Sequence, residues 1–199
     1  ASLARLAGDS AVGKVAIVLG VGMGHLALAL TEAWDAATWY LVDPFISTSA
    51  LTAAGAGPTD QDHQDAYEEL RQRLVGSEDR ILVLRDFSFS LAEAFLAELR
   101  RGFASSVGEH HAVGGDDSAG TEEEEEVRPA FVFADTGGKY AATRTDLVLW
   151  WPLLLNGGLL AGTGYDDAEI RLAVDEFAAE RMVHVQTTSG NSPCWVMQK

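Results

Sequence analysis

Residues 15–43 contain the pattern that most constrains the fold of this chain. A short apolar run, Val15–Leu19, ends in a glycine-rich turn over residues 20–24 (GVGMG), and an apolar stretch of helical character leads to a second run, Trp39–Val42, closed by Asp43. Glycine lets the backbone turn sharply and lets a ligand approach it closely. The helix that follows offers free N–H groups and the positive end of its dipole. We therefore predict a strand–turn–helix–strand unit that binds a nucleotide or nucleoside, with the acid accepting hydrogen bonds from ribose hydroxyls.

The alternation of strands and helices continues to the end of the chain. Further strands are expected at 80–84, 129–134, 159–161, 182–186 and 194–197, and further helices at 62–75, 91–103, 141–155 and 166–180. Such alternation favours a doubly wound α/β fold with right-handed crossovers. The last two strands have no helix between them and should pair as an antiparallel hairpin. We predict a mostly parallel, seven-stranded, Rossmann-like sheet with a C-terminal antiparallel hairpin, and a ligand at the carboxyl ends of the first strands.

The length of 199 residues fits one domain spanning residues 1–199. Within it, residues 104–128 are rich in glycine, serine and histidine and then run through five consecutive glutamates, Glu122–Glu126. Such a segment cannot bury enough apolar surface to order itself, so we predict a disordered acidic insertion. A linker between two domains is disfavoured because the same alternation resumes after the segment.

The charge of the chain excludes several partners. Its formal net charge of −16 argues against binding to a nucleic-acid backbone, which needs lysine and arginine, and to an anionic membrane surface.

No apolar stretch reaches the roughly 20 residues of a membrane span. The single cysteine, Cys194, cannot form an internal disulfide, and no signal peptide is visible. We therefore expect a cytoplasmic protein.

Several short motifs in the second half of the chain resemble those of one enzyme family. They are, in order, DTGGKY at 135–140, WWPLL at 150–154, NGGLL at 156–160, GTGY at 162–165 and AVDEF at 173–177. With the GxGxG turn, these motifs resemble the class I S-adenosylmethionine (SAM)-dependent methyltransferases. The most similar branch is that of small-molecule O-methyltransferases, which carry a DGDHxY-type motif after the fourth strand. The resemblance spans 14–199 apart from the acidic insertion, and implies SAM-dependent methyl transfer to a small-molecule nucleophile.

The resemblance also implies a cofactor site at the ends of the first four strands. Its members would be Gly20, Gly22, Gly24, Asp43, Asp86, Ser88 and Asp135. The glycines would form the turn under the methionine and ribose parts of SAM, and Asp43 would bind the ribose hydroxyls. Asp86 or Ser88, after the third strand, would lie near the adenine. Asp135, at the tip of the fourth strand, would face the transferable methyl group and is the candidate catalytic residue.

Departures from the family pattern argue against a catalytic metal. The DGDH-like motif begins with Asp135 but lacks its second acid and its histidine, and a later acidic pair is replaced by Thr163 and Gly164. Hard divalent cations require several oxygen ligands. We therefore predict a metal-independent reaction.

Two other functions remain open. A degenerate methyltransferase-like domain that acts as a binding or interaction module is favoured by the lost carboxylates and by Val18, which replaces the acid that such families carry two residues before the first glycine. A nicotinamide-dependent oxidoreductase is disfavoured by the GxGxG spacing and by the terminal hairpin.

Overall fold

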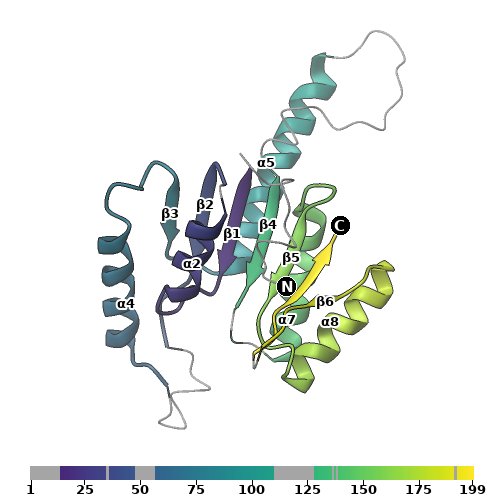
Figure 1. Cartoon of the computed structure of the whole chain (residues 1–199). Coiled ribbons are helices and arrows are strands. Elements are labelled where there is room, and N and C mark those ends of the chain that lie inside the picture. Colours follow the sequence, from purple (N-terminus) through teal and green to yellow (C-terminus); the bar gives the residue numbers. More distant parts are fainter. Residues whose placement is uncertain are drawn as a thin grey trace.

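In a computed structural model of the chain, a central sheet lies between two layers of helices (Figure 1). The structure describes residues 14–34, 36–47, 57–109, 128–135, 137, 139–190 and 192–199, and at 101–109 it describes the backbone alone. Most of the predicted acidic insertion, residues 110–127, lies outside the described residues.

The sheet has seven strands in the order β3-β2-β1-β4-β5-β7-β6. The strands are β1 Val15–Leu19, β2 Thr38–Val42, β3 Ile81–Leu84, β4 Pro129–Ala134, β5 Leu159–Gly162, β6 Gln186–Thr187 and β7 Trp195–Gln198. The first five strands are parallel to one another, whereas β7 runs antiparallel to both β5 and β6. The predicted α/β class and terminal hairpin are confirmed. The strand order reverses between β1 and β4, which makes the carboxyl ends of these strands the expected ligand site.

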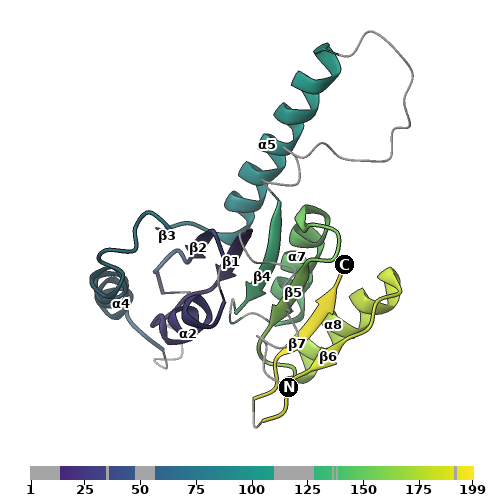
Figure 2. The same ribbon diagram turned by 45° about the horizontal axis from the view of Figure 1, so that its top comes forward.

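Helices cover both faces of the sheet (Figure 2). They are α2 His25–Ala33 and α4 Asp60–Arg73 on one face, and α5 Ser88–Glu109, α7 Tyr140–Trp150 and α8 Ala168–Arg181 on the other, with the 3-10 turn η2 Trp151–Leu153. Within β1, Ala16 and Val18 pack toward the first face, and Ile17 and Leu19 pack toward the second. Such continuous burial is typical of a parallel strand covered on both sides. Val18 therefore belongs to the core. Among the described residues, no helix has the length and apolar character needed to cross a membrane.

The predicted strand at 182–186 is wrong for most of its length. Met182 adopts a left-handed conformation, with φ of 57°, and the N–H of Val183 donates to the carbonyl of Ala178 at 3.0 Å. This geometry closes the C-terminus of α8, so pairing with β7 starts only at Gln186. Glycine normally marks such a cap, and Met182 gives no comparable signal in the sequence.

Two helix ends also differ from expectation. The helix predicted to reach residue 155 ends at Trp150 and continues as the 3-10 turn, which contains Pro152; proline has no N–H to continue the ladder. Helix α5 runs to Glu109 rather than to residue 103, so it overlaps the first residues of the expected acidic insertion.

Candidate functional site

A cavity of about 490 Å³ opens at the carboxyl ends of the first four strands. Its lining comes chiefly from residues 20–26 after β1, 42–44 at the end of β2, 87–88 after β3, and Asp135 and Gly137 after β4. This is the point where the strand order reverses, and cavities of this size accommodate small molecules. All but one of the predicted site residues line it; the exception is Asp86.

All three glycines of the turn have a positive φ, but Gly22 and Gly24 have different surroundings. A Cβ built on Gly22, which has φ of 53°, would meet no atom within 4 Å. A Cβ built on Gly24, at φ of 80°, would lie 2.8 Å from Cδ1 of Leu70 on α4. Gly22 therefore leaves open space beside the backbone, whereas Gly24 also allows α4 to pack closely against the turn.

Asp43 at the end of β2 is joined to the glycine turn through its carboxylate. Its Oδ2 accepts hydrogen bonds from the N–H groups of Val21 at 2.8 Å and Gly22 at 2.9 Å. Its Oδ1 accepts from the N–H of Phe45 at 2.6 Å, and the residue is buried. A carboxylate offers about four acceptor positions, so one remains for a ligand. Asp43 thus braces the turn, a role that the sequence did not indicate.

The residues after β3 divide between the cavity and the surface. Ser88 lines the cavity, and its hydroxyl donates to Oδ1 of the buried Asp146 at 2.7 Å. The exposed Asp86 instead accepts a hydrogen bond from the N–H of Phe87 at 2.7 Å. Phe87 lines the cavity and stacks on Phe89 with ring centroids 5.3 Å apart. Phe87 was not among the predicted site residues, although an aromatic residue three positions after a strand was a usable signal.

Asp135 lies between this cavity and a smaller one of about 130 Å³. Its N–H donates to the carbonyl of Leu19 at 2.7 Å, which joins the ends of β1 and β4. The hydroxyl of Thr163 donates to its Oδ1 at 2.5 Å. The carbonyl of Thr163 accepts in turn from the indole N–H of Trp195 at 3.1 Å. The backbone of Asp135 is therefore held by β1, and its carboxylate by Thr163 at the end of β5, which is itself held by Trp195 of β7.

The donor groups around Asp135 are poor in metal ligands. Gly137 has no side chain, and the GTGY motif at 162–165 contributes the hydroxyl of Thr163 and no carboxylate. Within the described residues, no group of three or more histidine, cysteine or acidic side chains could hold a metal ion.

Lys139 and Tyr140 of the DTGGKY motif connect α7 to α8. The ammonium of Lys139 pairs with Asp167 at 3.0 Å, and this hydrogen bond raises the pKa of Lys139. The hydroxyl of Tyr140 donates to Glu176 at 2.5 Å, which raises the pKa of Tyr140. Lys139 also lines the smaller cavity, but Tyr140 has a contact role between helices.

Comparisons with known proteins support the fold. No protein-family model and no curated protein matches the chain. A candidate methyltransferase from Streptococcus mutans, solved in complex with SAH, is 13% identical and superimposes with a TM-score of 0.55 over 95% of this chain and 90% of that one. An rRNA methylase from Streptococcus thermophilus is 15% identical, with a TM-score of 0.56 over 98% and 91%. A calicheamicin methyltransferase is 15% identical, with a TM-score of 0.59 over 94% and 72%. At these identities the likeness establishes a Rossmann-like fold shared with methyltransferases.

Proposed function

We propose that the protein transfers a methyl group from SAM to a small-molecule nucleophile without a catalytic metal. The observation that carries the proposal is the cavity at the ends of β1 to β4, which brings together the glycine turn, Asp43 and Asp135. A solved structure with the same fold is a complex with SAH, the demethylated product of SAM.

The residues of the cavity fit SAM. The open space beside Gly22 gives a ligand access to the backbone of the turn, where a side chain would obstruct it. The remaining acceptor position of Asp43 suits a ribose hydroxyl. The ring of Phe87 and the hydroxyl of Ser88 provide an aromatic and a polar contact for adenine.

Methyl transfer from a sulfonium is an in-line displacement in which the nucleophile–carbon bond forms as the carbon–sulfur bond breaks. The protein contributes mainly by orienting the two reactants, an effect that reaches roughly 7–11 kcal/mol in the best cases. Asp135, held by Thr163, accepts the proton that the nucleophile loses. An acceptor that is already ionised needs no such base.

A small-molecule acceptor agrees better with the charges than a nucleic acid does. The formal net charge is −16, and the described lining of the larger cavity contains His25 and His63 but no lysine or arginine. Binding to a phosphate backbone depends on such cations. The solved structures that share this fold include both rRNA and small-molecule methylases, and we place this chain with the second kind.

A binding module without catalysis is the second candidate, and the hydrogen bond from Thr163 to Asp135 favours it. A carboxylate oxygen that already accepts from a hydroxyl is a weaker base. In this case the turn and Asp43 form a stable ligand-binding loop, and Asp135 serves only to join β4 to β1 and β5.

The test is transfer of a labelled methyl group from SAM to a panel of phenols, carboxylic acids and amines in excess chelator. We expect a labelled product from at least one class, with the same rate when magnesium replaces the chelator. Activity that requires magnesium would overturn the metal-free reaction. Binding of SAH without transfer to any acceptor would favour the binding module instead.

A further inference from the structure

The segment after β2 contains an unfavourable backbone conformation at a fully buried residue. Phe45 has φ of 48° and no exposed surface. Its N–H bonds Asp43, and its ring packs edge-on against Tyr67 of α4 with centroids 5.1 Å apart. A bulky side chain at positive φ persists only where its surroundings hold it there.

Arg85, directly after β3, supplies several of the contacts that hold this segment. Its guanidinium donates from Nη2 to the carbonyl of Phe45 at 3.2 Å and from Nε to the carbonyl of Pro44 at 3.4 Å. It also donates from Nη1 to Oε1 of Gln64 at 2.6 Å. The guanidinium carbon lies 5.4 Å from the ring centroid of Tyr67, the ring on which Phe45 packs. The planar, multiply donating head of arginine can make all these contacts at once.

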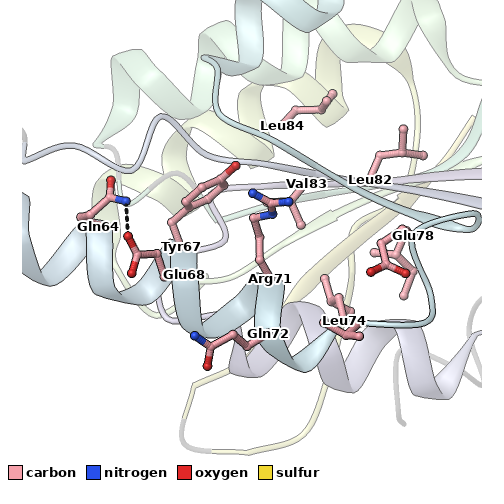
Figure 3. Close-up of a pocket in the computed structure, with 12 residues that line it drawn as sticks. Gln64, Tyr67, Glu68, Arg71, Gln72, Leu74, Glu78, Leu82, Val83 and Leu84 are labelled. Atoms are coloured by element: carbon pink, nitrogen blue, oxygen red, sulfur yellow. Dashed lines mark hydrogen bonds between the residues drawn. The ribbon is translucent and has the colours of Figure 1, made fainter.

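These contacts connect the cavity at the ends of β1 to β4, called the cofactor cavity below, with a groove of about 760 Å³ between α4 and the edge strand β3. Figure 3 shows Gln64, Tyr67 and Arg71 in this groove, with the hydrogen bond of 2.7 Å from Gln64 to Glu68. Gln64 accepts a hydrogen bond from Arg85, and Arg85 also donates to the carbonyl of Phe45. The N–H of Phe45 donates to Asp43, whose carboxylate accepts from the glycine turn. These hydrogen bonds therefore connect the groove to the glycine turn.

Arg71 provides a natural comparison. Its guanidinium carbon also lies near the ring of Tyr67, at 5.8 Å from the centroid. Within the described residues, however, Arg71 has no hydrogen bond to residues 44–45. The two arginines therefore share the aromatic contact and differ in their contact with the segment after β2.

We infer that Arg85 is a positioning residue for the cofactor cavity, an inference that rests on the proposed function. It holds Pro44 and Phe45 so that Asp43 and the glycine turn are in place before a ligand arrives. Without Arg85 the segment must be ordered at the time of binding, which weakens affinity. Arg85 is not among the residues that line the cavity, so it should affect binding and leave the chemical step unchanged.

The first test compares Arg85→Ala with Arg71→Ala in the full chain, by calorimetric titration with SAH and by the kinetics of methyl transfer. For Arg85→Ala we expect about tenfold weaker SAH binding, equivalent to about 1.4 kcal/mol, with a similar rise in KM for SAM and little change in kcat. Arg85→Lys keeps the positive charge but only one donating nitrogen, so its SAH affinity should lie between those of Arg85→Ala and the native protein. Arg71→Ala should bind SAH like the native protein. Equal effects of the two alanine variants, or a fall in kcat alone, would overturn the inference.

The second test does not depend on SAM. Hydrogen exchange of the backbone amides of Val21 and Phe45, which donate to Asp43, should be faster in Arg85→Ala than in Arg71→Ala. If the native protein bound no SAH, the proposed function would fail, and this measurement alone would decide whether Arg85 holds the segment. Unchanged exchange in Arg85→Ala and in Arg85→Lys would show that it does not.

Discussion

Replacing Asp43 by alanine should destabilise the whole domain as well as weaken ligand binding. The carboxylate accepts from three backbone N–H groups, those of Val21, Gly22 and Phe45. Gly22 is exposed, so its N–H can bond water, but Val21 and Phe45 are buried. Each buried donor left without an acceptor costs about 1–3 kcal/mol. The sum, roughly 2–6 kcal/mol, is a large part of the roughly 5–15 kcal/mol that stabilises an ordinary domain.

Urea unfolding of Asp43→Ala measures this loss directly, and Asp86→Ala is the matched control. Asp86 also follows a strand, but it is exposed and its carboxylate accepts from one neighbouring N–H, so its removal should change the unfolding free energy by less than about 0.5 kcal/mol. Asp43→Asn retains one carbonyl acceptor, so its loss of unfolding free energy should lie between those of Asp43→Ala and Asp86→Ala. In folded protein, SAH binding to Asp43→Ala should weaken by roughly 1.5–3 kcal/mol, the scale of a charged hydrogen bond. A stability loss below about 0.5 kcal/mol for Asp43→Ala would refute the bracing role.

Three further predictions concern the turn, the reaction and the pH dependence. Gly24→Ala should lower the unfolding free energy in urea by about 1–2 kcal/mol because of its positive φ, with added crowding from Leu70; unchanged stability would contradict this assignment. Asp135→Asn should slow methyl transfer by about a hundredfold and change the calorimetric affinity for SAH far less; equal losses would make Asp135 a binding residue. The hydrogen bond from Lys139 is the main cause of the lowered pKa of Asp167 in the folded protein. Asp167 therefore stabilises the fold fully above its unfolded pKa of about 3.9. This contribution is lost as the pH falls through the lower folded pKa. Asp167→Asn should therefore lower the melting temperature at neutral pH and match the native protein in strong acid; a gap that persists in strong acid would argue against the ion pair.

The strands were predictable because their apolar runs are continuous and flanked by polar or glycine-rich turns. The bounds of β1 and β4 match the sequence prediction, and those of β2 and β3 differ by one residue at their first positions. Helix α4 begins at Asp60, two residues earlier than predicted, because Thr59 and Asp62 form a reciprocal capping box that we did not recognise. The error at β6 has a different origin, since the cap at Met182 depends on backbone geometry rather than on residue type.

The candidate site was predictable where a residue type has few alternative uses. Positive φ at Gly20, Gly22 and Gly24 agrees with the glycine turn, and Asp135 lies at the tip of β4 and lines the cavity. The role of Arg85 depends on contacts with residues about 20 and 40 positions away, which no local pattern reveals. The bonding of Asp43 to the glycine turn was hidden for the same reason, because Val21 and Gly22 precede it by more than 20 residues.

The most direct test of a SAM site in this cavity is calorimetric titration of SAH into the native protein, Gly22→Val and Gly157→Val, with NAD as a second ligand. Gly22 and Gly157 both have positive φ and open space beside the Cα, but only Gly22 lines the cavity, so the pair separates backbone strain from loss of the ligand site. We predict that SAH binds the native protein and Gly157→Val, that binding to folded Gly22→Val is abolished, and that NAD does not bind. Equal SAH affinity for the native protein and Gly22→Val, or binding of NAD in place of SAH, would contradict a SAM site at the glycine turn.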